Sequence, residues 1–447
     1  MFITESLINK YNVQVPRYTS YPTVPAWKEN TPLKSFHEII DTEILKEGIS
    51  LYLHLPFCEV LCTYCGCNKR ITKNHSVEEK YMEYILKEWK MYLKLLPSNV
   101  ILKELHLGGG TPTFFSPENL HQLITSLYEG VVLHEDFEAS FEGHPNNTTR
   151  EHLQVLYDVG FRRVSYGVQD LDPKVQVTIN RIQPHENVVK VVDLAREIGY
   201  TSINFDLIYG LPFQNLNTIT DTFEKVIQLL PDRIAFYSYA HVPWVSKSQR
   251  LYDENDLPQG SEKRALYEKG KELLMKSGYH DIGMDHFSLE SDSLYRAQTQ
   301  KKLHRNFMGY TTNNSKISIG LGVSSISDFY WGYRQNVKKL EEYYRILDQD
   351  ILPIFKGIDL TKEDTINRQS ILDITCNFET KITPEDLSKS DSSYFNELLE
   401  DGLIEYDGNL LKITTLGLSF IRNIAALFDP NYQFVSDSQE KMYSSSM

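Results

Sequence analysis

The chain has 447 residues, a formal net charge of −14, 41% apolar and 24% charged residues. This composition is that of a globular protein, and no run of 18 or more apolar residues offers a membrane span. The N-terminus "MFITESLINKYNVQVP" lacks the basic region and apolar core of a secretory signal, so we expect a cytoplasmic protein. The acidic balance opposes non-specific nucleic-acid binding. Neither nucleic acid nor a membrane is expected as a partner.

An N-terminal arm rich in proline precedes an alternation of strands and helices. Six strands are predicted, at residues 49–55, 101–107, 138–142, 162–168, 202–210 and 233–240. Helical patterns lie between them. Residues 79–93 place Tyr81, Ile85 and Trp89 on one face, and Ser116 can cap a helix that begins at Pro117. Such alternation requires crossover connections and a mostly parallel sheet, so the class is α/β, as a partial barrel or an open doubly wound sheet.

Polar residues fall where the predicted strands end. They are Cys58, Gly108 to Gly110, Glu142, Gln169, Asp206 and His241. Ligand chemistry in barrels and in open parallel sheets collects at the carboxyl ends of the strands. We therefore expect these residues along one edge of the sheet.

The alternation weakens past residue 288, and the composition changes near residue 360. Residues 361–447 hold 7 Lys or Arg and 15 Asp or Glu, and they suggest helices around a hairpin that turns at Asp407 and Gly408. The outline is similar to a winged helix, but the acidity argues against DNA binding. We predict an arm at 1–45, a catalytic domain at 46–360 and a smaller, mostly helical domain at 361–447.

Four of the five cysteines lie within ten residues, with the spacing C-x₃-C-x₂-C followed by Cys67. In a reducing compartment this cluster favours metal binding over disulfides. A structural zinc site usually has two separated ligand pairs, and Cys376 lies in an apolar stretch where a buried thiol is expected. Three thiolates on a short loop can instead hold three corners of a [4Fe–4S] cluster and leave one iron open. Zinc stays as the alternative.

Longer motifs carry a resemblance to a known family. C-x₃-C-x₂-C and the glycine turn "HLGGGTPT" (106–113) resemble the radical S-adenosylmethionine superfamily. The chain also contains "PRYTSYPT" (16–23), "CTYCGCNK" (62–69), "GVQD" (167–170), "NFDLIYGLP" (204–212), "YAHVP" (239–243), "GMDHF" (283–287), "LHRNFMGYTT" (303–312), "GVSSIS" (322–327), "CNF" (376–378) and "IRNI" (421–424). Together these motifs resemble the oxygen-independent coproporphyrinogen III dehydrogenases (oxidases) of bacterial haem synthesis. The resemblance runs from the arm to the C-terminal domain and implies a partial (βα)6 radical-SAM barrel.

The resemblance also implies a reaction and its partners. Two propionates of coproporphyrinogen III would be decarboxylated to vinyl groups, giving protoporphyrinogen IX. The cofactors would be a [4Fe–4S] cluster and two molecules of S-adenosylmethionine. An electron donor such as a flavodoxin or ferredoxin, an unidentified electron acceptor and a monomeric state are further expectations.

By the same resemblance, Cys58, Cys62 and Cys65 ligate the cluster. Cys67 is the family's fourth cysteine and our candidate catalytic residue, with a structural thiol as the alternative. The S-adenosylmethionine on the cluster would contact Tyr52, Gly109, Glu142, Ala240 and Ile326. The second molecule would contact Tyr64, Gly110, Thr111, Gln169, Arg181 and Asp206. An acid late in an apolar strand is costly unless it is paired, which independently favours Glu142 and Asp206 as ligand contacts over ordinary structural hydrogen bonding.

Four carboxylates on an apolar tetrapyrrole call for cations beside aromatic rings. Arg17 and Arg305 are the candidates, with Tyr18, Tyr21 and Tyr239 alongside. Surface or helix-capping roles for both arginines are the alternative. One departure from the family pattern is His144, which replaces an acid that better-known members carry.

Two other functions stay open at this point. A haem-binding chaperone of the same superfamily keeps the three cysteines, but it usually has phenylalanine where Cys67 stands and lacks the "RYTSYPT" arm. A haem-degrading radical methyltransferase would act on haem rather than on a porphyrinogen.

Overall fold

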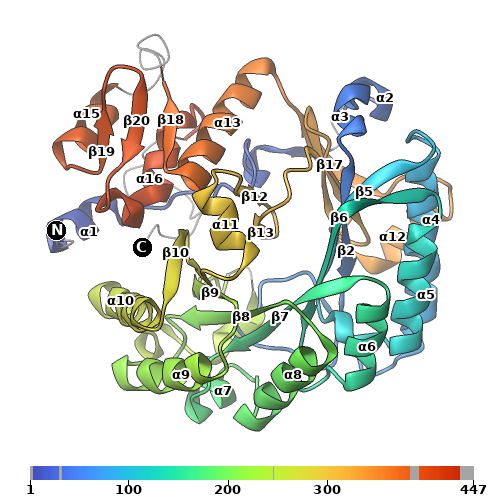
Figure 1. Cartoon of the computed structure of the whole chain (residues 1–447), viewed down its shortest axis with the longest axis horizontal. Helices are drawn as coiled ribbons and strands as arrows, with labels where there is room; N and C mark the ends of the chain where they lie inside the picture. The colour runs from blue at the N-terminus through green and yellow to red at the C-terminus, as the bar shows by residue number, and fades with distance from the viewer. Residues whose placement is uncertain (1–3, 30–32, 245, 383–391, 433–447) are drawn as a thin grey trace.

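A computed structural model describes residues 4–29, 33–244, 246–382 and 392–432 (Figure 1). All six predicted strands are present in it, adjacent and parallel, in chain order. They are β2 (Ile49–Leu55), β5 (Val100–Gly109), β6 (Val131–Gly143), β7 (Phe161–Gln169), β8 (Ser202–Tyr209) and β9 (Arg233–Ser238). The predicted α/β class is confirmed.

The sheet extends beyond these six strands at both ends. Beside β2 lies a seventh parallel strand, β14 (Ile317–Leu321), and the other added strands are antiparallel to their neighbours. These are β15 (Ile326–Asp328), β16 (Gly332–Asn336), β17 (Ile354–Asp359) and β1 (Lys28–Glu29) on one side, and β11 (His286–Leu289) and β10 (Tyr279–Gly283) on the other. Within the described residues the strand order runs from β1 to β10 without closing, which is a partial barrel.

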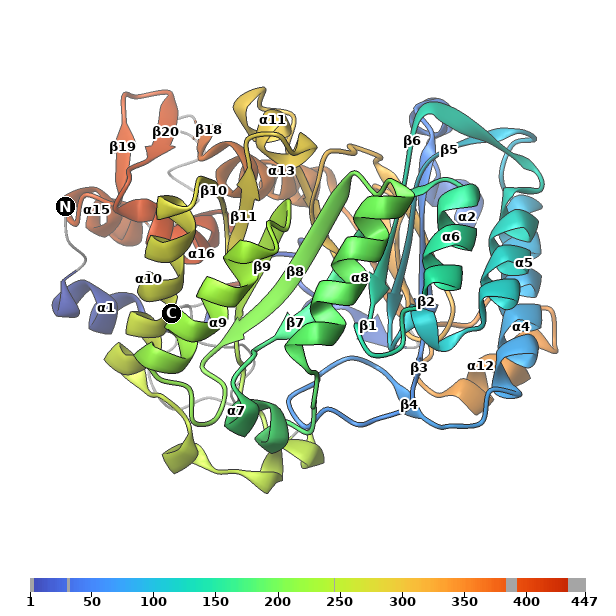
Figure 2. The ribbon, with the colours of Figure 1, turned by 60° about the horizontal axis from the view of Figure 1, so that its bottom comes forward.

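Helices cover the outer face of the parallel strands (Figure 2). They are α4 (Val77–Leu93), α5 (Pro117–Tyr128), α6 (Arg150–Asp158), α8 (His185–Ile198), α9 (Leu216–Gln228) and α10 (Gly260–Lys276). The predicted cap is present, since the Ser116 side chain accepts a hydrogen bond from the Asn119 amide. No helix among the described residues has both the length and the apolar content to cross a bilayer.

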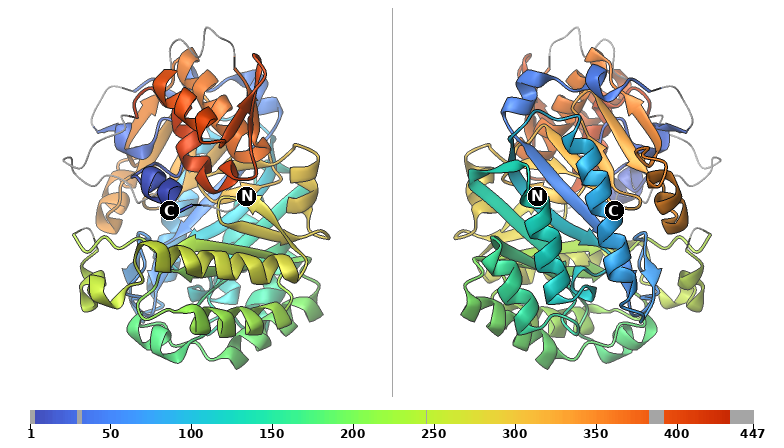
Figure 3. Two further views of the ribbon diagram at one scale, coloured as in Figure 1. Left: turned by 90° about the vertical axis from the view of Figure 1, so that its left-hand side faces the viewer. Right: turned by 90° about the vertical axis from the view of Figure 1, so that its right-hand side faces the viewer.

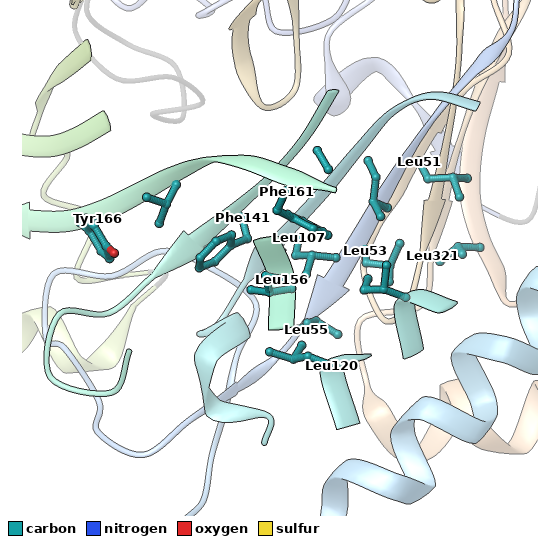
Figure 4. Close-up of a cluster of buried hydrophobic side chains, with 14 of the residues drawn as sticks. Leu51, Leu53, Leu55, Leu107, Leu120, Phe141, Leu156, Phe161, Tyr166 and Leu321 are labelled. Carbon is teal, nitrogen blue, oxygen red and sulfur yellow. The ribbon is translucent and has the colours of Figure 1, made fainter. Parts of the chain in front are cut away.

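The main core lies between this helical layer and the sheet (Figure 4). Leu51, Leu53 and Leu55 of β2 are fully buried in it. Successive side chains of a strand point to opposite faces. Tyr52 and His54 therefore face the concave side of the sheet, where the cavities described below lie.

The C-terminal region has its own three-stranded sheet in the order β18-β20-β19. Its elements are α13 (Lys362–Asn377), β18 (Glu379–Lys381), α15 (Ser392–Glu400), β19 (Ile404–Tyr406), β20 (Leu410–Ile413) and α16 (Ile421–Ala425). The hairpin turns at Asp407 and Gly408, as expected, with Gly408 at a φ of 96°. The boundaries at residues 45 and 360 stay a prediction.

The N-terminal arm packs onto this C-terminal region. Tyr11 at the end of α1 (Glu5–Tyr11) shares one apolar cluster with Val15, Tyr18 and Tyr21 of the arm and with α16. Figure 3 shows α1 beside the C-terminal elements. The arm is thus fixed by a second core, next to the mouth of the barrel.

Shorter elements complete the described chain. They are α2 (Phe36–Ile39), α3 (Thr42–Lys46), β3 (Phe57–Cys58), β4 (Arg70–Ile71), α7 (Pro173–Thr178), α11 (Ser293–Thr299), β12 (His304–Asn306), β13 (Gly309–Thr311) and α12 (Leu340–Leu347), with several 3-10 turns between them.

Candidate active site

Three cavities adjoin one another on the concave side of the sheet. The thiol cavity, of about 560 Å³, contains twelve predicted site residues: Cys58, Cys62, Tyr64, Cys65, Cys67, Gly109, Gly110, Thr111, Glu142, Gln169, Arg181 and Asp206. The central cavity, of about 570 Å³, is lined by Tyr52, Ile326 and Arg305 and shares Cys67 and Glu142 with the thiol cavity. The cationic cavity, of about 80 Å³, is lined by Arg17 and shares Arg305 with the central one.

The cysteine loop is held on both sides by backbone contacts. The strand pair β3 and β4 anchors it, with the Thr72 amide donating to the Cys58 carbonyl at 2.9 Å. On the other side, the Thr63 amide donates to the Ile179 carbonyl at 2.9 Å, and Asn180 Nδ2 donates to the Leu61 carbonyl at 2.8 Å. The thiols are therefore presented at the carboxyl edge of the sheet by a fixed loop.

The thiols differ in acidity. A hydrogen bond from the Cys67 thiol and the charge of Lys69 lower the pKa of Cys65 below that of an ordinary thiol, which favours its thiolate form. The same bond raises the pKa of Cys67, and burial raises that of Cys58 to about 11. Metal binding would remove the remaining protons, as thiolate coordination does generally.

The donor set fits a multi-iron cluster better than one zinc ion. Among the described residues no three His, Cys, Asp or Glu side chains converge on a point that could hold a single ion. A four-iron cluster needs three separate thiolates, one for each iron corner. Arg181 Nη1 lies 3.5 Å from Cys62 Sγ, and Thr111 Oγ1 lies 3.4 Å from Cys58 Sγ, so two of the sulfurs already have polar partners that favour negative charge.

The glycine turn packs directly against the cysteine loop. The Gly110 amide donates to the Leu55 carbonyl at 2.8 Å, and a Cβ at Gly110 would lie 2.6 Å from the Pro56 carbonyl carbon. Gly109 has a φ of 114°, and its amide donates to Glu142 Oε2 at 3.2 Å. Only glycine allows this approach of two backbones.

The polar groups at the strand ends form one wall of the thiol cavity. Burial and the nearby charge of Glu142 raise the pKa of Asp206 to about 6, although Ser165 Oγ and Asn204 Nδ2 donate to it at 3.0 and 2.9 Å. Gln169 adopts a φ of 65°, a strained conformation for this residue type. Arg181 Nη2 donates to the Gly167 carbonyl at 2.5 Å.

One nitrogen on this wall has no partner. Arg181 Nε is buried without a hydrogen-bond acceptor among the described residues. A buried donor left unpaired is costly, so a polar ligand in the thiol cavity is the natural acceptor.

Three predicted contact residues lie outside the thiol and central cavities, and one of them, Tyr239, packs in a separate apolar cluster where its hydroxyl is 2.7 Å from that of Tyr252. Ala240 is exposed just after β9, and its carbonyl accepts from Gln249 Nε2 at 3.4 Å. Arg17 lines only the cationic cavity. His241, expected on the same edge, instead contacts the Tyr239 hydroxyl at 3.1 Å.

The sequence analysis did not predict several residues that line or support the cavities. The His54 ring packs against Gly109. Its Nδ1 lies 3.1 Å from the Tyr52 hydroxyl, and its Nε2 lies 2.8 Å from the Asn68 carbonyl. The alternation of "LYLHL" contained this signal, because Tyr52 and His54 share the face opposite the leucines. His144, given above only as a departure from the family pattern, lines the thiol cavity, and burial lowers its pKa well below the ordinary value.

Comparisons with known proteins agree with this geometry. Residues 52–226 match the family model of the radical SAM superfamily. The fold and the site therefore define a radical SAM enzyme, an oxidoreductase that binds a [4Fe–4S] cluster and S-adenosylmethionine.

Full-length relatives identify the branch of the superfamily. The chain is 37% identical to the oxygen-independent coproporphyrinogen III oxidase of Synechocystis sp., over 98% of this chain and 97% of the relative, and 37% identical to that of Escherichia coli K12, over 95% and 94%. The solved structure of the Escherichia coli coproporphyrinogen III oxidase superposes with a TM-score of 0.89 at 35% identity, covering 94% of this chain and all of that one. The chain belongs to the oxygen-independent coproporphyrinogen III oxidase family, as the motifs predicted.

Proposed function

We propose that the chain decarboxylates two propionates of coproporphyrinogen III to vinyl groups without oxygen, giving protoporphyrinogen IX. The observation that carries the proposal is the pair of adjoining cavities. A thiol cavity suited to the cofactors shares Cys67 and Glu142 with a central cavity of about 570 Å³, which is of the size of a small-molecule site.

In this proposal Cys58, Cys62 and Cys65 hold the cluster. Tyr52, Gly109, Glu142, Ala240 and Ile326 contact one S-adenosylmethionine, and Tyr64, Gly110, Thr111, Gln169, Arg181 and Asp206 contact a second. When bound, the cluster and S-adenosylmethionine supply a 5′-deoxyadenosyl radical that abstracts a hydrogen atom from the substrate.

The central cavity supplies the contacts that an apolar tetrapyrrole with four carboxylates requires. Aromatic rings of Tyr18, Tyr21, Phe307 and Tyr333 line it. Arg305 adds a buried cation beside them. We propose that the rings pack against the pyrroles and that the guanidinium binds a carboxylate, with Arg17 of the arm as a second cation.

Cys67 lies at the boundary of the two cavities, since it lines both of them. Its pKa is raised by the hydrogen bond to Cys65, so its sulfur stays protonated at neutral pH. We propose that this thiol acts beside the substrate and does not ligate iron. A structural role is the alternative, and Cys67→Ala separates the two by turnover with an intact cluster.

The remaining partners are part of the proposal. We propose a cytoplasmic monomer that receives electrons from a flavodoxin or ferredoxin and passes the electrons from the substrate to a separate acceptor. Nucleic acid and membranes have no part in it.

The test is an anaerobic assay of the reconstituted protein with S-adenosylmethionine, a strong reductant and coproporphyrinogen III. Porphyrin masses and 5′-deoxyadenosine are measured beside a Cys62→Ala control. Loss of two CO₂ and four hydrogens per porphyrinogen in the wild type alone is expected. Deoxyadenosine without a porphyrin change would refute the substrate. Tight haem binding without any deoxyadenosine from a reduced cluster would instead favour a haem-binding chaperone.

A further inference from the structure

Arg305 is a buried cation without an acid partner. It lies on β12, is 7% exposed, and its Nε and Nη1 are buried with no hydrogen-bond acceptor among the described residues. Its remaining nitrogen, Nη2, donates to the Arg17 carbonyl at 3.4 Å, and its guanidinium lies 5.0 Å from the centre of the Tyr310 ring. Burying an unpaired charge is costly, and a carboxylate that accepts from either free donor would supply the missing negative charge.

The cationic cavity behind Arg305 concentrates positive charge in an acidic protein. Five cationic side chains line it against two carboxylates. The cations are Arg17, Arg264, Lys271, Arg305 and Arg422. Of the carboxylates, Asp281 is 2.6 Å from Lys271 Nζ, and Asp285 is 3.8 Å from Arg17 Nη1. Arg264 also forms an ion pair with Glu268, which lies outside the lining, so the cations of the cavity outnumber its carboxylates but are partly compensated.

The charges in this region oppose one another. Burial and the charge of Arg17 lower the pKa of Arg422 to about 9, and the same two causes lower the pKa of Lys263 to about 8. An anion placed among these groups would relieve the repulsion. The cavity volume of about 80 Å³ exceeds the about 10–15 Å³ that one water needs, so there is room for a carboxylate.

The order of the cavities decides which carboxylate binds there. The central cavity adjoins the thiol cavity through Cys67 and Glu142 and adjoins the cationic cavity through Arg305. The propionates that react must lie toward the thiol cavity, where the hydrogen-abstracting radical arises. Resting on the proposed function, we propose that Arg305 and the cationic cavity bind a propionate carboxylate that the reaction keeps.

The test compares substrate with product, because protoporphyrinogen IX retains only the unreacted propionates. Reconstituted wild type, Arg305→Gln and Arg264→Gln are equilibrated anaerobically with coproporphyrinogen III or with protoporphyrinogen IX. Bound and free pigment are separated by ultrafiltration, oxidised and quantified. Arg296→Gln is the matched control, since Arg296 is exposed on α11 and lines none of the three cavities.

We expect Arg305→Gln to weaken the binding of both pigments by the same factor, roughly 10- to 100-fold, as for loss of a charged hydrogen-bond pair. Arg264→Gln should weaken both by a smaller, equal factor, and it carries the test if Arg305→Gln does not fold. A loss confined to coproporphyrinogen would overturn the inference and assign Arg305 to a reacting propionate. Unchanged binding of both pigments by folded variants would also overturn it.

This inference and the proposed function fail separately. A wild type that turns over coproporphyrinogen while the arginine variants bind both pigments normally refutes only the cationic subsite. A wild type that neither binds nor converts coproporphyrinogen refutes the proposed function itself.

Discussion

Glu88 is a buried carboxylate whose replacement by glutamine makes a quantitative prediction. It is fully buried on α4. Its Oε2 accepts from the Gly322 amide at 2.8 Å and from the Tyr343 hydroxyl at 2.7 Å, and its Oε1 accepts from Asn336 Nδ2 at 2.7 Å. This network holds the turn at 322–325 that leads into Ile326, the proposed S-adenosylmethionine contact.

Burial raises the pKa of Glu88 from its ordinary 4.5 to about 7. The unfolded chain loses this proton near pH 4.5, whereas the folded chain keeps it to about pH 7, so the folded state binds more protons in between. The free energy of unfolding therefore falls as pH rises through this window, by about 3 kcal/mol at 1.36 kcal/mol per unit of pKa difference. At about 2.1 cal/mol/K of unfolding entropy per residue, this is a decrease of about 3 °C in melting temperature.

Glu88→Gln cannot titrate, so it removes this decrease. The amide nitrogen of the glutamine would face a group that donates a hydrogen bond to the Glu88 carboxylate. Loss of that buried hydrogen bond lowers the free energy of unfolding by about 1–3 kcal/mol. We expect the variant to melt below the wild type at pH 5 and to gain about 3 °C relative to it by pH 8. Thermal melts of the cluster-free chain at four pH values measure this, with the exposed Glu83→Gln on the same helix as control. Parallel pH profiles of wild type and Glu88→Gln would refute the reasoning.

Three further predictions concern the thiol cavity. Cys67→Ala should keep the brown colour and the iron content of the cluster. Alanine at any of the three proposed ligand cysteines should lose both. Loss of iron from Cys67→Ala would show that Cys67 is a ligand of the cluster. Gly110→Ala should lower the melting temperature and the formation of deoxyadenosine, because its Cβ would meet the Pro56 carbonyl. Gly66→Ala is the control, since a Cβ there meets nothing within 4 Å, and it should melt as the wild type does. Equal melting temperatures of the two variants would contradict this prediction. Because the pKa of Asp206 is about 6, we expect S-adenosylmethionine to bind more tightly as the pH rises from 5 to 7, as measured by equilibrium dialysis. Asp206→Asn should abolish this pH dependence. An unchanged pH dependence in the variant would exclude Asp206 as a contact of S-adenosylmethionine.

The six central strands and the cysteine loop could be predicted because their signals are local. An apolar run ending in a cysteine motif specifies both strand and site within a few residues, as in "LYLHLPFC". The seventh parallel strand, β14, was missed because it spans five residues and no helix pattern of the expected length separates it from its neighbours. Short antiparallel strands such as β15 to β17 give a weak periodic signal, and tertiary packing decides them.

The cationic cavity could not be predicted from any local pattern. Its lining comes from the arm, from α10, from β12 and from α16, which lie far apart in the chain. These segments meet only because the arm packs into the C-terminal apolar cluster. Each arginine alone is compatible with a surface role. Their convergence is a property of the fold.

The other buried arginines give the comparison on which the proposal for Arg305 rests. Arg233, Arg334 and Arg305 are buried to a similar extent, at 5, 4 and 7% exposed. Arg233 is 2.7 Å from an Asp292 oxygen, and Arg334 is 2.6 Å from an Asp359 oxygen. Arg305 has no carboxylate at salt-bridge distance among the described residues, although removing one partner of a buried pair usually destabilises a fold by several kcal/mol. A fold that pairs its other buried arginines leaves this one for an acid from outside the chain, and the proposed substrate carries four.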